Sequence, residues 1–198
     1  MNDIFLETPK VLAEGHVVIK DLDTNEIILD KYNAINFENL AYVIAQLLGN
    51  KTTGGNEHYI TKMAFGHGGT IIDGNGNVSY KTPKVNGSNG ALYLPSPAVS
   101  DPLLDFTKDI TNITVVNQET QAYTDLEMTV TLDYNEPSNA LATDTSADFE
   151  EPGDYVFDEI ALVTGNDEYL THLIFHPIQK SLNRKLEIIY SLRIRAGV

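Results

Sequence analysis

Residues 125–134, DLEMTVTLDY, alternate between apolar and polar side chains, and this period of two constrains the fold more than any other feature of the sequence. The apolar set is Leu126, Met128, Val130 and Leu132, and the polar set is Glu127, Thr129, Thr131 and Asp133. Such alternation indicates a strand with one buried and one solvated face, which is typical of antiparallel sheets. Several other short β-like segments follow one another without crossover helices. We therefore predict a mainly β protein, an antiparallel β-sandwich-like domain of about eight strands with one α-helix packed on it.

The other strands are predicted from short runs rich in β-branched and aromatic residues that are bounded by turn-forming residues. A hairpin is expected over residues 15–32, with its turn at Asp21 to Asn25. Further strands are expected at residues 59–65, 110–118, 155–164, 169–177 and 185–195. Short connections separate the last three, so we expect them to form a meander, with Pro177 ending the second strand.

One segment has helical rather than strand periodicity. Over residues 36–48, Phe37, Leu40, Ile44 and Leu47 fall at helical spacing. Asn36 is a suitable N-cap and Gly49 a suitable C-cap. We predict a helix that packs across the sheet through these four apolar side chains.

The chain is expected to form a single domain with long appendages. Residues 1–13 are interpreted as an N-terminal arm, and residues 14–198 as one β-rich domain with long loops at about 66–109 and 135–153. Ordering such segments costs about 1–2 kcal/mol per residue. This cost is met more readily if a neighbouring subunit supplies the buried surface.

The glycine-rich stretch FGHGGTIIDGNGN, residues 65–77, could be a phosphate loop, a calcium loop or a bent piece of backbone. A phosphate loop requires the pattern G-x-x-x-x-G-K-[ST], and residues 66–70 have neither this spacing nor a following lysine. A calcium loop could start at Asp73, but Val78 and Lys84 stand where it requires glycine and glutamate. We therefore interpret Gly66, Gly68 and Gly69 as the turn by which the chain leaves a strand and enters an arm.

Composition argues against several classes of partner. The formal charge is −15, from 28 acidic and 13 basic residues. Nucleic acids and anionic membranes require a basic face, so neither is expected as a partner. The first ten residues do not resemble a secretory signal, and no apolar run approaches the about 20 residues of a membrane span. The chain has no cysteine, which leaves the redox compartment undetermined.

No pattern in the sequence indicates catalysis. There is no G-x-S-x-G nucleophile motif, and acid pairs such as Asp158–Glu159 arise by chance in so acidic a chain. His172 and His176 would lie about 13 Å apart on a strand, which is too far to share a zinc ion, so we interpret them as structural. We expect no enzyme activity, no cofactor, no metal site and no small-molecule substrate.

A basic segment at residues 175–185 contrasts with the acidic remainder and contains Lys180, Arg184 and Lys185. Two interpretations remain open. The segment could pair locally with acids such as Glu187. Alternatively it could dock on the acidic loop of the next subunit, where Glu150 and Glu151 are the candidate partners. Opposite charge across such an interface would fix the register of the subunits and speed their encounter.

Four segments together resemble a family of virion structural proteins of tailed bacteriophages. They are residues 15–48, 59–70, 124–137 and 157–195. Within them the resemblance is carried by the N-A-I step into the predicted helix, the F-G-x-G-G step at residues 65–69, and LTHLIFHPIQKSLNR at residues 170–184. His67 stands in the F-G-x-G-G step where a small polar residue is expected.

The resemblance implies a structural role without catalytic residues. It implies a component of the neck, collar, tail or baseplate that is assembled in the host cytoplasm into a ring of its own copies, in contact with other neck or tail proteins. A carbohydrate-binding β-sandwich module is the alternative, because the chain has 10 tyrosines, including Tyr80, Tyr93 and Tyr155 in or beside loops.

Overall fold

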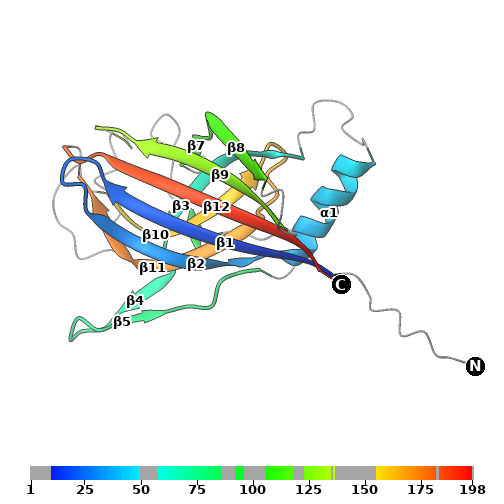
Figure 1. Ribbon diagram of the computed structural model, residues 1–198. Helices are drawn as coiled ribbons and strands as arrows, with labels where there is room; N and C mark the ends of the chain where they lie inside the picture. The colour runs from blue at the N-terminus through cyan, green and yellow to red at the C-terminus, as the bar shows by residue number, and fades with distance from the viewer. Residues whose placement is uncertain are drawn as a thin grey trace, which may run out of the picture.

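The computed structural model describes residues 10–49, 58–85, 92–95, 106–117, 123–134, 136, 155–181 and 183–197. These residues form one large antiparallel sheet that curls on itself, a separate two-stranded sheet and one helix (Figure 1). The prediction of a mainly β, sandwich-like antiparallel fold with one helix is confirmed. Of the predicted long loop at 135–153, only Glu136 lies within the described residues.

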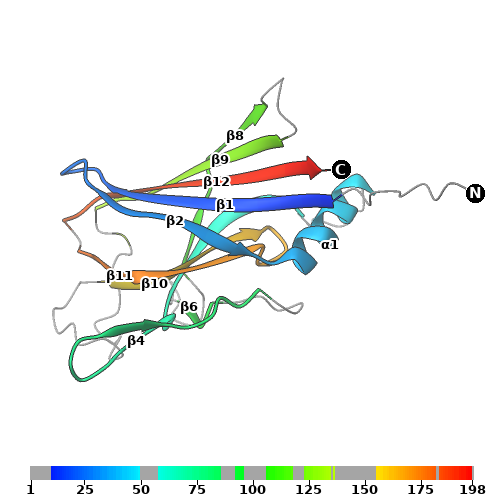
Figure 2. The same ribbon diagram turned by 60° about the horizontal axis from the view of Figure 1, so that its bottom comes forward.

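The curled sheet has the strand order β6-β3-β10-β11-β2-β1-β12-β9-β8, and β7 pairs with β3 beside β6. Figure 2 shows two layers. One layer holds β1 (Lys10–Asp21), β2 (Ile27–Ile35), β8 (Asn112–Asn117), β9 (Tyr123–Leu132) and β12 (Leu186–Gly197). The other holds β3 (Ile60–His67), β6 (Leu94–Pro95), β7 (Thr107–Asp109), β10 (Tyr155–Thr164) and β11 (Thr171–Lys180). Only two residue pairs, Ile35–Thr171 and Ala34–His172, join β2 to β11 where the sheet bends between layers.

The main core lies between the two layers. In β9 the predicted alternation is confirmed, because Met128, Val130 and Leu132 are all buried. At the centre, the ring of Phe157 packs edge-on against Phe65 and Phe175, each with ring centroids 5.6 Å apart. Large apolar and aromatic side chains of this kind supply most of the stabilisation from burial.

The helix α1 (Phe37–Leu48) lies at one end of the sheet, near the start of β1 and the end of β12 (Figure 1). Its predicted caps are confirmed: the Asn36 side chain accepts a hydrogen bond from the Asn39 amide, and Gly49 is the C-cap. The predicted buried face is only partly right. Leu40 and Val43 are buried, whereas Phe37 is 54% exposed and Leu47 is 45% exposed. The helix covers one end of the sandwich rather than lying across it, so a narrower stripe of its surface meets the core.

Three further expectations are corrected by the sheet. Strand β1 begins at Lys10, so residues 10–13 of the expected arm pair with β12. The last three strands do not form a meander, because β12 lies between β1 and β9 rather than beside β11. Strand β11 also continues past Pro177 to Lys180, since Pro177 lies where the pairing of β10 with β11 is irregular and no regular ladder bond is lost.

The expected loop at 66–109 contains short strands of its own. Strands β4 (Thr70–Ile72) and β5 (Val78–Tyr80) form the separate two-stranded sheet, and β6 and β7 pair with β3. We use the name strap for the described residues 68–85 and 92–95. The β4–β5 hairpin of the strap forms a third layer beside β10 and β11 (Figure 2), and the strap rejoins the large sheet as β6. A small second core is formed by Leu92 of the strap with Ala64, Ala161 and Val163.

Candidate functional site

The turn from β3 into the strap is held by a buried carboxylate. Asp158 of β10 is 3% exposed and accepts hydrogen bonds from the amides of Gly69, at 3.1 Å, and Thr70, at 2.7 Å, and from the Thr70 hydroxyl. The register of β10 against β11 shifts between Phe157 and Glu159, which places Asp158 at a bulge. Bulges redirect side chains in this way, and here the redirected carboxylate meets the turn.

The glycines at this turn are required by backbone geometry and by space. Gly68 has a φ of 93°, in the left-handed region that favours glycine. A Cβ on Gly69 would lie 2.8 Å from Cγ of Glu159 and 2.9 Å from Cγ2 of Ile174. Gly66 lies within β3, where it pairs with Glu159 and Pro95. Of the three glycines expected to form the turn, Gly68 and Gly69 therefore lie in it and Gly66 lies just before it.

The second half of the glycine stretch is the tip of the β4–β5 hairpin. The Asp73 carboxylate accepts hydrogen bonds from the amides of Asn75 and Asn77 and from the Asn77 side chain. These bonds, the side-chain bond from Asn77 above all, lower the pKa of Asp73. Gly76 has a φ of 82°. Since backbone and side-chain donors already engage the Asp73 oxygens, this segment is a turn stabilised by its own side chains.

A buried histidine and glutamate face the strap on its inner side. His172 Nε2 lies 2.7 Å from Glu159 Oε2, and the two side chains are 2% and 0% exposed. His172 Nδ1 accepts the amide hydrogen of Lys84 at 2.8 Å. Because Nδ1 is used as an acceptor, the ring proton must lie on Nε2, where it is donated to Glu159. Glu159 Oε2 also accepts the amide hydrogen of Tyr93 at 2.8 Å.

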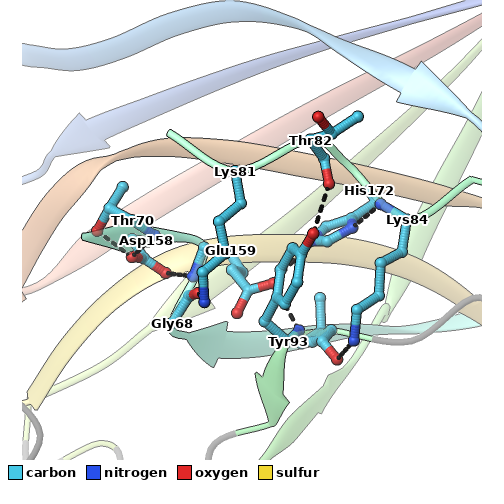
Figure 3. Close-up of polar contacts among 11 residues, drawn as sticks. Gly68, Thr70, Lys81, Thr82, Lys84, Tyr93, Asp158, Glu159 and His172 are labelled. Carbon is cyan, nitrogen blue, oxygen red and sulfur yellow. Dashed lines mark hydrogen bonds and ion pairs between the residues drawn. The ribbon is translucent and has the colours of Figure 1, made fainter. Parts of the chain in front are cut away.

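Two lysines of the strap surround Tyr93, as Figure 3 shows. The ammonium groups of Lys81 and Lys84 lie 4.5 Å and 4.3 Å from the centroid of the Tyr93 ring. Lys81 also donates to the carbonyl of Gly68, and Lys84 to the carbonyl of Leu92. The Tyr93 hydroxyl donates to the carbonyl of Thr82 at 2.9 Å. Cation–π contacts and hydrogen bonds thus tie the two described parts of the strap together.

These contacts describe a polar clamp, by which we mean Asp158, Glu159 and His172. Each of its three side chains accepts at least one backbone amide hydrogen from the strap. A buried polar group that is fully bonded fixes its partners, because breaking any bond would leave a group unsatisfied away from water. Among the described residues, no group of three or more His, Asp or Glu side chains is arranged to hold a metal ion. The arrangement positions the strap on the sheet.

The residues expected to form a subunit interface are used within the chain where they are described. Lys180 is 1% exposed, and its ammonium group donates to the carbonyls of Asp133 and Ser181. Burial lowers the pKa of Lys180. Lys180 is therefore not on the surface, contrary to its expected role in docking. Glu150 and Glu151 lie outside the described residues.

The other two basic residues of that segment also have acidic partners nearby. Arg184 Nε lies 2.6 Å from Asp21, and Lys185 Nζ lies 3.3 Å from Asp133. Burial alone would raise the pKa of Asp21, but the bond from Arg184 and those from the amides of Thr24 and Asp23 lower it. The basic segment is thus paired locally, although with Asp21 and Asp133 rather than with Glu187.

Sequence reasoning missed the clamp as a unit. The adjacent acids Asp158 and Glu159 were visible as a pair, and His172 was interpreted as structural, but nothing in the sequence showed that all three meet the strap. One available signal was that the two acids interrupt the apolar strand FDEIALV, residues 157–163. Charged residues inside a strand that is covered on both faces require partners, and this could have pointed to a buried site.

Exposed apolar side chains occur at several places on the described surface, among them the β4–β5 hairpin and the region of α1 and β8. On the β4–β5 hairpin, Ile72 and Tyr80 share one face and are 42% and 51% exposed, while Ile71 on the other face is 55% exposed. At the other place, Leu47 of α1 and Ile113 and Val115 of β8 are exposed. Clusters of exposed apolar residues mark interaction surfaces more often than single ones do.

Comparison of the chain with protein-family models, with curated proteins and with solved structures returned no match. Within the part of the chain that the structure describes, no helix is both long enough and apolar enough to cross a membrane.

Proposed function

We propose that the protein is a structural component of a tailed-bacteriophage virion that joins copies of itself, or neighbouring neck or tail proteins, in a ring assembled in the host cytoplasm. The resemblance of residues 15–48, 59–70, 124–137 and 157–195 to virion structural proteins supports this proposal. The structural observation that carries it is the exposure of several apolar side chains together on the β4–β5 hairpin and again beside α1 and β8.

Two different exposed surfaces suit assembly into a ring. If the β4–β5 hairpin of one copy met a different surface on the next, the contact would be head-to-tail, and such contacts close into rings when the rotation between copies allows it. The described strap packs on its own chain, so it is not an extended arm that contacts a neighbouring subunit. The proposed contacts therefore rest on exposed positions such as Ile72 and Tyr80.

Native mass spectrometry over a range of protein concentrations, with electron microscopy of the same samples, tests this proposal. We expect closed oligomers, formed by the protein alone or with neck and tail proteins of the same virion. The double variant Ile72→Ser/Tyr80→Ser, which changes two exposed residues on one face of the hairpin, should weaken assembly at least tenfold. Ile27→Ser is the matched control, because Ile27 is 58% exposed but lies in the β1–β2 hairpin. A chain that stays monomeric alone and in every such mixture would refute the proposal.

One observation favours carbohydrate binding as a second candidate. A cleft of about 750 Å³ lies beside β1, β2 and the start of α1, and Tyr32 and Phe37 in its lining are 71% and 54% exposed. Exposed aromatic rings beside polar groups such as Glu14 and Asn33 suit stacking against sugars. Binding to a panel of glycans that Tyr32→Ala abolishes would support this function, and no binding to any glycan of the panel would reject it.

A further inference from the structure

An apolar groove of about 240 Å³ opens between α1 and the inner face of the sheet near β8. Its lining includes Val43, Ile44 and Leu47 of the helix and Ile113, Leu126 and Ile194 of the sheet. Leu47 and Ile113 are 45% and 39% exposed, so the groove is open at its mouth. It is continuous with the main core, to which Val43 belongs and against which Ile44 and Leu126 pack.

The groove is uncovered because β8 is the last strand of the sheet. Ile113 pairs with Met128, and Val115 pairs with Leu126, so both β8 residues share the face that is buried elsewhere in the sheet. Val115 is nevertheless 63% exposed. Among the described residues β8 pairs only with β9, which leaves its other edge available for strand addition.

Residues 1–9, MNDIFLETP, are the candidate occupant. They lie outside the described residues and precede Lys10, the first residue of β1. The segment carries three consecutive apolar residues, Ile4, Phe5 and Leu6, in an otherwise polar context. An extended peptide of this kind can add to an exposed strand edge while alternate side chains enter a pocket.

The length of this segment indicates whether it can contact Ile113 of its own chain or only Ile113 of a neighbouring copy. Ile113 is aligned through Met128 and Tyr190 with Val17, seven positions after Lys10 in β1. At about 3.3 Å per residue, Ile113 therefore lies about 23 Å along the strand direction from Lys10, and also three strands across the sheet. Ile4, Phe5 and Leu6 lie four to six positions before Lys10 and reach about 20 Å at most. The chain's own segment is thus too short to place them beside Ile113, although Ile194 in the same groove pairs with Ala13 and lies much closer to Lys10.

We propose that residues 1–9 of a neighbouring copy add to the free edge of β8 and place the Phe5 side chain beside Ile113, at the mouth of the groove beside α1. This inference rests on the proposed self-assembly and names one contact that would build it. The contact is head-to-tail, because the donor segment and the acceptor groove are different surfaces of the same chain.

A disulfide trap tests the contact, since the chain has no cysteine of its own. The variant Phe5→Cys/Ile113→Cys should give covalent dimers and larger species on a non-reducing gel after mild oxidation. The control Phe5→Cys/Ile27→Cys places the second thiol at an exposed position far from the groove and should give at least tenfold less product. Thermal melts of both variants check that they fold.

Labelled peptide MNDIFLETP provides a second measurement. It should bind the full chain, and Leu47→Asp should weaken that binding at least tenfold, whereas Tyr32→Asp should not. Disulfides formed only within single chains, or interchain product no greater than in the control, would overturn the inference. If native mass spectrometry still shows rings in that case, only this contact fails. If the chain never self-associates, the inference fails together with the self-assembly part of the proposed function.

Discussion

Asp158→Asn is the sharpest perturbation of the polar clamp, because it changes the charge and one acceptor atom without changing the shape of the side chain. In the wild-type protein the Asp158 carboxylate accepts three hydrogen bonds, from two amides and one hydroxyl of the turn at Gly69 and Thr70. The asparagine side chain has one acceptor oxygen and a donor group in place of the second oxygen. If the oxygen keeps the bond from Gly69, the new amide group meets the backbone amide of Thr70, and two donors face each other.

The expected loss follows from these contacts. A net hydrogen bond to a charged group contributes about 1.5–3 kcal/mol, and a buried donor left without a partner costs about 1–3 kcal/mol. The Thr70 hydroxyl can rotate to accept from the new amide group, so only the bond from the Thr70 amide is lost. We expect Asp158→Asn to lower the free energy of unfolding by about 2–4 kcal/mol.

Urea denaturation measures this loss, and amide hydrogen exchange locates it. Protection should fall most at Gly69 and Thr70, because their amides bond to Asp158. Asp73→Asn is the matched control: Asp73 also accepts backbone amides in a turn of the same strap, but it is exposed, and it should leave the unfolding free energy nearly unchanged. An Asp158→Asn protein as stable as the control, with unchanged protection at both amides, would show that the clamp does not hold the strap.

Three further predictions concern other parts of the molecule. Val43→Asp should destabilise the protein by about 3 kcal/mol, while Phe37→Ser should change its stability by less than about 1 kcal/mol; equal effects in thermal melts would contradict the observed helix face. Gly15→Ala should lower the free energy of unfolding by about 1–3 kcal/mol in urea denaturation, because the new Cβ would collide with the side chain of Asn33 in β2. Wild-type stability would mean that the Asn33 side chain can move away. Arg184→Gln should lower stability by about 1 kcal/mol at pH 7. Because the pKa of Asp21 is lowered in the folded state, that difference is present above pH 3.8 and should shrink as the pH falls through the lowered pKa. A difference that does not shrink at any pH below 3.8 would refute the role of this pair.

The elements that could be predicted from sequence are those fixed by local pattern. The period of two at residues 125–134 and the β-branched run at 155–164 depend only on which face of a strand is buried. The ends of α1 were predictable because Asn36 and Gly49 act on their own neighbours in the chain. In each case the physical cause lies within a few residues of the effect.

The features that could not be predicted depend on partners far away in the chain. Nothing local to residues 186–197 says that β12 inserts between β1 and β9 rather than following β11. The buried face of the helix was predicted only in part. Helical spacing shows which side of the helix is apolar, but it does not show how much of that side is covered by the end of a curled sheet. The clamp could not be predicted without knowing that a bulge places Asp158 beside a turn that lies 88 positions earlier in the chain.

The segment at residues 170–184 carries much of the proposed resemblance to virion proteins, yet several of its polar residues form bonds within the chain. His172 bonds to Glu159 and to the Lys84 amide, Lys180 bonds to two carbonyls, and Arg184 pairs with Asp21. Side chains bonded in this way stabilise the fold, and their polar groups are less available for contacts with a partner. If the chain assembles as proposed, we therefore expect its contacts with neighbours to be made by exposed apolar side chains, such as those of the β4–β5 hairpin and of the groove beside α1. Charge reversal in residues 170–184 would then disturb assembly mainly by destabilising the subunit, whereas substitutions at Ile72 or Ile113 would weaken assembly and leave the subunit folded.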